Sequence, residues 1–111
     1  PYQSEMTPAY ARLCLPFLAA LMITDGRIDP RRFTPQGFAD SAIAALAAKV
    51  ALVGDGNPDP NALFPQGLAI TLADGTRLDR AIAATLGSPA NPLSPAEAAA
   101  KLALARELAP D

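Results

Sequence analysis

One stretch near the start of the chain, ARLCLPFLAALMITDG at residues 11–26, constrains the fold more than any other. Between Leu13 and Ile23 it carries no charged or strongly polar side chain, and Pro16 stands inside it. A helix that is apolar on every side must be covered on every side. The cover comes from the rest of this small domain, from a separate domain, or from both, with one face of the helix toward each. The run is too short to cross a bilayer, which takes about 20 residues.

The composition excludes several classes of function. The 111 residues suit one domain, 1–111, with a small core. The basic residues are scattered, which argues against a nucleic-acid surface. The chain has no histidine, the commonest acid–base group and metal ligand, and its single cysteine allows neither an internal disulfide nor a zinc site. We expect a cytoplasmic protein without a membrane span. Because the chain starts without methionine, we also expect it to be a piece of a longer polypeptide.

Three hydroxyl–proline pairs mark predicted helix starts. In each pair the hydroxyl suits the N-cap, and the proline suits the first helical position, where a missing N–H costs nothing. Ser94 gains a capping box from Glu97, three residues on. The pairs are Thr7-Pro8, Thr34-Pro35 and Ser94-Pro95. The predicted helices are 8–24 with a kink at Pro16, a short turn at 35–39, a helix from 40 or 41 to 48, and 95–109.

Two segments predict strands. KVALVGD at residues 49–55 reads as one strand, ended by glycine. Between about 68 and 83, alternating apolar residues flank Asp74-Gly75, the strongest short-range signal for a hairpin. The fold class expected is therefore α+β, with about three helices packed on a small, mostly antiparallel sheet.

Candidate polar sites carry little chemistry. The alternating residues of DGNPDPN resemble the start of a calcium loop, but Pro60 and Gln66 occupy the glycine and glutamate positions that an EF-hand needs. We interpret this segment as a polar surface loop. We expect Asp25 and Asp29 to cap and solvate a turn.

The hairpin charges and the residues beside the apolar run have simple structural interpretations. Arg77, Asp79 and Arg80 form a solvated face. Cys14 is a buried structural cysteine, and Arg12 is either a surface charge or an anion contact in a cleft. The residues by themselves predict no catalytic group and no metal site.

Three segments also resemble a known family when taken in order and spacing. The first holds a helix with a Leu-Pro pair, the second ends in Ala47-Ala48-Lys49-Val50, and the third joins a hairpin Asp-Gly to a Gly-x-Pro-x-Asn-Pro-Leu-Ser element and a later lysine. This arrangement resembles the C-terminal part of the MmgE/PrpD family, which includes 2-methylcitrate dehydratase, cis-aconitate decarboxylase and iminodisuccinate epimerase. The matching residues of the third segment are Gly87, Pro89, Asn91, Pro92, Leu93, Ser94 and Lys101.

The resemblance implies the C-terminal lid, or substrate-closing, domain of a longer lyase or isomerase. Its large N-terminal helical catalytic domain is absent here, so the lid is inactive alone. Family members work without a cofactor, usually as homodimers, on small di- or tricarboxylates. They abstract a proton α to a carboxylate, and dehydration, decarboxylation or re-protonation follows. The missing domain would then cover part of the apolar helix.

The resemblance also implies where substrate contacts lie. Relatives such as the decarboxylase carry serine and tyrosine where this chain has Cys14 and Phe17, and that tyrosine faces the substrate. Phenylalanine cannot donate a proton, so no catalytic residue is assigned. Arg12, Cys14 and Phe17 are the predicted substrate contacts, as anion contact and pocket wall. The alternative is a stand-alone interaction or dimerisation domain that has lost the catalytic half. An independent small enzyme lacks a recognisable catalytic constellation.

Overall fold

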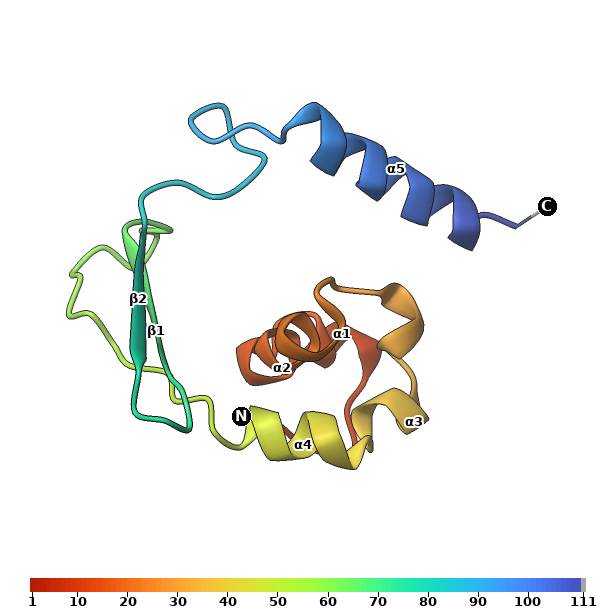
Figure 1. The fold of residues 1–111 in the computed structure, drawn as a ribbon, viewed down its shortest axis with the longest axis horizontal. Coiled ribbons are helices and arrows are strands. Elements are labelled where there is room, and N and C mark those ends of the chain that lie inside the picture. The colour runs from red at the N-terminus through yellow and green to blue at the C-terminus, as the bar shows by residue number, and fades with distance from the viewer. Residues whose placement is uncertain (111) are drawn as a thin grey trace. The chain divides into compact units, whose positions relative to one another are not determined.

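The computed structural model describes residues 1–110 and divides into two compact units, residues 1–55 and 56–111 (Figure 1). The regular elements of the first unit are all helices, and the second unit holds a β-hairpin and one helix. The first unit contains α1 (Pro8–Ala11), α2 (Leu15–Asp25), the 3₁₀ helix η1 (Pro30–Arg32), α3 (Pro35–Phe38) and α4 (Ser41–Ala47). The second contains β1 (Gln66–Thr71), β2 (Arg77–Ile82) and α5 (Pro95–Leu108). The predicted α+β class is confirmed.

The helix starts follow the predicted caps. Thr7, Thr34 and Ser94 are N-caps whose hydroxyls accept hydrogen bonds from backbone N–H groups one turn on. The capping box between Ser94 and Glu97 is complete in both directions. Each of these helices has proline in its first turn. Local hydrogen bonding therefore fixes where these helices begin.

The predicted continuous helix over 8–24 is wrong, because the chain breaks between α1 and α2. Pro16 has no N–H to donate, and its ring would meet the carbonyl of Arg12 in a continuous helix. The chain turns instead, with Leu13 and Cys14 donating to carbonyls three residues back. Cys14 then becomes the N-cap of α2, which places Pro16 in the first turn, where proline is tolerated. Gly26, with φ of 71°, ends α2 in the left-handed conformation.

The core of the first unit is built by helices packing on one another. Phe17 of α2 is completely buried, and its ring meets those of Phe33 and Phe38 edge to face at centroid distances of 5.6 and 5.5 Å. Edge-to-face pairs of this kind add to the stabilisation that burial alone gives. α2 also packs against α4. The buried apolar residues are Ala11, Cys14, Phe17, Ala20, Leu21, Phe38, Ile43 and Ala47.

The second unit confirms the predicted hairpin, with strand bounds slightly different from 68–83. β1 and β2 pair antiparallel, and Ile70 lies opposite Leu78. The turn holds Gly75 at φ of 87°, and the Asp74 side chain accepts a hydrogen bond from the N–H of Thr76. α5 follows a connector that contains the isolated bridge between Ser88 and Asn91.

The strand predicted over 49–55 does not form. Within residues 1–110 the only sheet is the two-stranded β1–β2 ladder. Lys49 and Val50 instead donate to the carbonyls of Leu46 and Ala47, which extends the turn after α4. Alternating apolar residues suit a strand, but a strand also needs a neighbouring strand to accept its hydrogen bonds. None of the described helices has the length and apolar character that crossing a membrane requires.

Candidate functional site

The three predicted substrate contacts lie at one corner of the first unit, where α1 ends and α2 begins. Arg12 is the C-cap of α1 and is exposed, and Cys14 is the N-cap of α2. Cys14 is 5% exposed, whereas Phe17, one turn further on, is 0% exposed. The three residues are close in sequence and lie at one bend of the chain. Of the three, only Arg12 has an exposed side chain. Substrate contact by these residues stays a prediction.

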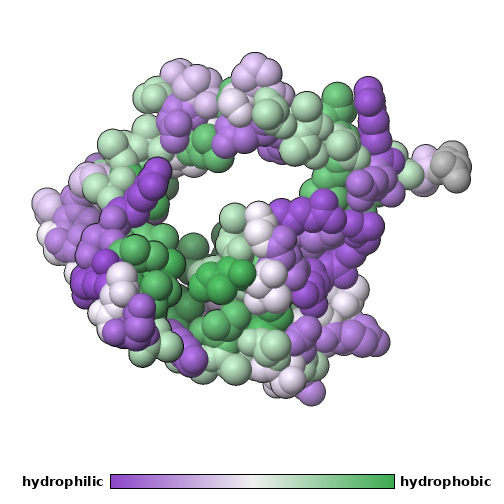
Figure 2. All heavy atoms as spheres, in the orientation of Figure 1, coloured by the Kyte–Doolittle hydropathy of each residue, from purple (hydrophilic) through white to green (hydrophobic). Residues whose placement is uncertain are grey.

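The surface around Arg12 is apolar. Leu13 is 84% exposed and Leu15 is 57% exposed. Met22 and Ile23, on α2, are also about half exposed. Figure 2 shows hydrophobic atoms lying open on the surface over α2. We call residues 12–15 the corner: an exposed guanidinium that makes no hydrogen bond or ion pair with the rest of residues 1–110, flanked by two exposed leucines.

The N-terminal segment is tied to this corner. The Tyr10 hydroxyl donates to the carbonyl oxygen of Pro1 at 2.5 Å, and the Cys14 Sγ lies 3.7 Å from the same oxygen. The Tyr2 hydroxyl donates to the carbonyl of Phe38. Burial, followed by the nearby carboxylate of Asp40, raises the pKa of the Tyr2 hydroxyl above its ordinary value. Tyr2 therefore remains a protonated donor, and the backbone before α1 is held against the unit at both of its contact points.

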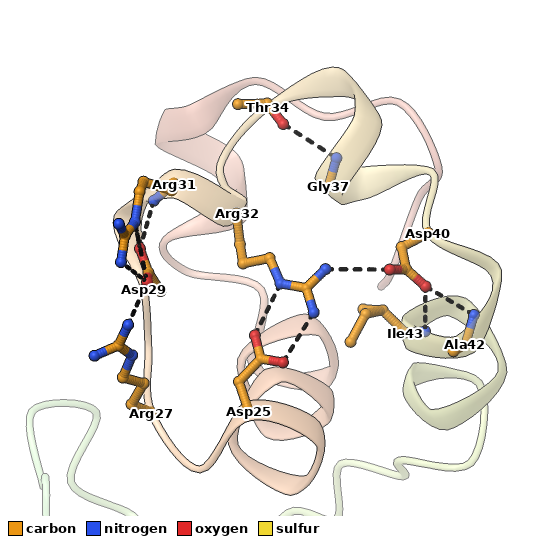
Figure 3. A network of polar contacts seen from close by, with 10 residues as sticks. All are labelled: Asp25, Arg27, Asp29, Arg31, Arg32, Thr34, Gly37, Asp40, Ala42 and Ile43. Atoms are coloured by element: carbon orange, nitrogen blue, oxygen red, sulfur yellow. Dashed lines mark hydrogen bonds and ion pairs between the residues drawn. The ribbon is translucent and has the colours of Figure 1, made fainter.

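A polar cluster lies at the other end of α2, centred on Arg32 (Figure 3). Its guanidinium donates to both carboxylate oxygens of Asp25 at 2.8 Å, and to Asp40 at 3.1 Å. The other oxygen of Asp40 accepts from the N–H groups of Ala42 and Ile43, which caps α4. One cation thus joins the end of α2 to the start of α4, and no sequence signal predicted this link.

The electrostatics of this cluster are those of a structural ion pair. The hydrogen bonds from Arg32 hold the pKa of Asp25 below its ordinary value. The hydrogen bond from the backbone N–H of Ile43 does most to lower the pKa of Asp40, and the hydrogen bond from Arg32 lowers it further. Both carboxylates in turn raise the pKa of Arg32. These groups are charged at neutral pH and saturated with partners, so they do not suit proton transfer.

Asp29 forms the cap of η1 and is 8% exposed. Its carboxylate accepts from the backbone N–H and the side chain of Arg31, and from Arg27 at 3.0 Å. These bonds, those of the Arg31 side chain foremost, depress the pKa of Asp29 strongly. The predicted capping role of Asp29 is confirmed. For Asp25 the prediction of a solvated turn missed the pairing with Arg32.

The loop that begins at Asp55 is the predicted polar surface loop. The side chains of Asn57 and Asp59 accept hydrogen bonds from the N–H groups two residues on, and the segment is exposed. On the hairpin, Arg77 and Asp79 pair at 2.9 Å with side chains more than 60% exposed, as expected of a solvated face. Arg80, the third residue predicted for that face, is exposed but lies on the opposite face of β2. Among the described residues, no group of three or more possible ligands is placed to hold a metal ion.

Comparison with known proteins gives one match. The family model for the MmgE/PrpD C-terminal domain matches residues 2–109. A search of the curated proteins and a search of the solved structures each found no match.

Proposed function

We propose that this chain, which belongs to the MmgE/PrpD family as its C-terminal domain, is the lid of a larger lyase or isomerase. The substrate class is a small di- or tricarboxylate, the reaction is dehydratase-like, and the domain is inactive alone. A preceding helical domain supplies the acid and base, and the complete enzyme is a cytoplasmic homodimer. The observation that carries the proposal is the family match over nearly the whole chain.

The chemistry of the corner supports closure over an anionic substrate. A guanidinium binds a carboxylate through two parallel hydrogen bonds, and it does so more strongly where water is excluded. The exposed Leu13 and Leu15 beside Arg12 exclude water once a second surface covers them. Arg12 is therefore assigned as the anion contact of the closed lid.

In this proposal Cys14 and Phe17, which are buried, support the exposed Arg12 and do not react. The Cys14 thiol lies in hydrogen-bond reach of the Pro1 carbonyl, and the Phe17 ring packs between two other rings. Both shape the pocket wall by fixing the position of the corner. Neither supplies a proton to the reaction, so deprotonation next to the substrate carboxylate falls to groups outside this domain.

The test uses the native polypeptide that carries this domain. It is assayed for turnover of small di- and tricarboxylates, and Arg12→Ala is compared with Arg12→Lys. Arg106, an exposed arginine in the last turn of α5, gives Arg106→Ala as a matched surface control. Loss of a charged hydrogen bond worth about 1.5–3 kcal/mol predicts a roughly 10- to 150-fold fall in kcat/KM for Arg12→Ala. The control stays within about threefold, since a surface change rarely costs more than about 0.5 kcal/mol. Absence of turnover with every such substrate, or an unaffected Arg12→Ala enzyme, contradicts the proposal.

The exposed leucines of the corner also favour a second candidate, a stand-alone interaction or dimerisation domain. The mass of the native polypeptide separates the two. A native chain of about this length, which binds a hydrophobic dye or self-associates by light scattering, supports the interaction domain. A chain several times longer supports the lid.

A further inference from the structure

Arg12, the proposed anion contact, has no internal partner that fixes its guanidinium. The guanidinium makes no hydrogen bond or ion pair with the rest of residues 1–110, so its place depends on the backbone of the corner. Arg12 is the C-cap of α1, which has only four residues. A single helical turn is not stable by itself. Contacts from outside α1 must therefore hold the corner in place.

Tyr10 connects the corner to the segment before α1. Its N–H donates to the hydroxyl of Thr7, the N-cap, at 3.2 Å, and its carbonyl accepts from the N–H of Leu13 at 3.0 Å. Its phenolic hydroxyl donates to the carbonyl oxygen of Pro1 at 2.5 Å. One residue thus joins the incoming segment, the start of α1 and the corner. Only the bond to Pro1 uses the side chain, so it can be removed without changing the backbone.

Tyr2 provides a contrast within the same segment. Its hydroxyl donates to the carbonyl oxygen of Phe38, at the end of α3, and not to a group of the corner. The two tyrosines of the chain therefore hold one segment at two places, through the same kind of hydrogen bond. Only the bond made by Tyr10 leads to the backbone beside Arg12.

We propose that Tyr10 is a positioning residue for Arg12, and that its hydrogen bond to the Pro1 carbonyl keeps the guanidinium where it meets the substrate carboxylate. This inference rests on the proposed function, which assigns Arg12 as the anion contact. A phenol has one proton to donate, and Tyr10 donates it to Pro1, so Tyr10 acts through Arg12 and not on the substrate. A group that is held in place before binding loses less freedom on binding, which favours affinity.

The experiment compares two tyrosine variants of the native polypeptide that carries this domain. Tyr10→Phe removes only the hydroxyl, and loss of one such hydrogen bond predicts a roughly 3- to 10-fold fall in kcat/KM. The fall is expected in KM with kcat unchanged, because the carboxylate is present in the substrate and in the transition state alike. Tyr2→Phe removes a hydroxyl of the same kind from the same segment, and it is expected to leave KM within about twofold of the parent.

A double-mutant cycle shows whether Tyr10 acts through Arg12. In Arg12→Ala there is no guanidinium to place, so adding Tyr10→Phe is expected to change kcat/KM by less than about twofold. The Cys14 thiol gives a second readout, because it contacts the same Pro1 carbonyl. Its labelling, followed by peptide mass spectrometry, is expected to be about threefold or more faster in Tyr10→Phe than in Tyr2→Phe. Circular dichroism of each variant shows whether the fold is retained.

Several results overturn the inference. An equal effect of Tyr10→Phe with and without Arg12, or a fall in kcat at unchanged KM, limits Tyr10 to a structural role. A rise in KM of the same size in Tyr2→Phe, or equal labelling of Cys14 in the two variants, does so too.

The proposed function is judged separately. Turnover that falls in Arg12→Ala but not in Tyr10→Phe rejects the positioning role and keeps the lid. A polypeptide without turnover, or one that Arg12→Ala leaves unchanged, rejects the assignment of Arg12 and this role of Tyr10 with it.

Discussion

Gly37→Ala is expected to destabilise the first unit, although alanine normally favours a helix over glycine by about 1 kcal/mol. Gly37 lies in α3, and a Cβ built on it would stand 2.0 Å from the carbonyl oxygen of Arg32 and 2.8 Å from its carbonyl carbon. Both atoms are backbone, so no side-chain rotation relieves the contact. The close approach of α3 to η1 therefore requires glycine.

The size of the effect follows from the movement needed. Ordinary contact begins at 3.4 Å, so α3 and η1 must separate by more than 1 Å. That movement displaces the Phe33 and Phe38 rings from Phe17 and pulls Arg32 from its two carboxylates. Overpacking in cores costs about 1–3 kcal/mol, and loss of an edge-to-face pair adds about 0.5–1.5 kcal/mol. After the helix preference of alanine is subtracted, we expect a net loss of about 0.5–3.5 kcal/mol.

Urea unfolding followed by circular dichroism measures this loss. Gly54→Ala is the matched control, because a Cβ there meets no atom within 4 Å. It is expected to be neutral or to stabilise by up to about 1 kcal/mol, through the unfolded state. A Gly37→Ala protein as stable as the Gly54→Ala protein would refute the close packing of α3 on η1.

Two further predictions concern the same unit. Asp25 and Asp40 have lowered pKa values when folded, so their contribution is present above the ordinary pKa of 3.8 and is lost as pH falls below it. In urea unfolding between about pH 5 and pH 2, Arg32→Met should therefore show a shallower loss of stability than the parent, whereas an equal slope would contradict the pairing. Phe17→Tyr places a hydroxyl in the buried aromatic cluster and is expected to cost about 1–3 kcal/mol in unfolding free energy. A cost near zero would mean that the added hydroxyl reaches solvent or a hydrogen-bond partner. The Phe17 ring would then line the proposed pocket directly instead of lying buried behind it.

The sequence predicted the elements whose signals are local. The hydroxyl–proline pairs and the Asp74-Gly75 turn each act within four residues, and all of them were confirmed. The position of Pro16 within its helix was predicted wrongly, because proline suits both a kinked helix and the first turn of a helix. In the structure Pro16 lies in the first turn of α2. The family was recognised from motifs in order, and the family match confirmed it.

What the sequence did not predict depends on distant partners. Arg32 meets Asp25 and Asp40 across separations of seven and eight residues, and neither spacing carries a recognised signal. The same holds for the strand predicted at 49–55, whose apolar alternation was correct but which has no neighbouring strand. At the candidate site the family resemblance suggested three substrate contacts. The burial of Cys14 was predicted from its apolar surroundings and is confirmed, whereas the complete burial of Phe17 arises from rings supplied by other elements.

The tie between the N-terminal segment and the corner has a mechanical consequence. Tyr10 and Cys14 both contact the carbonyl oxygen of Pro1, and they lie on either side of the bend between α1 and α2. A displacement of Pro1 would therefore act on both sides of the bend at once. Arg12 lies at the bend itself, so its position depends on where Pro1 is held.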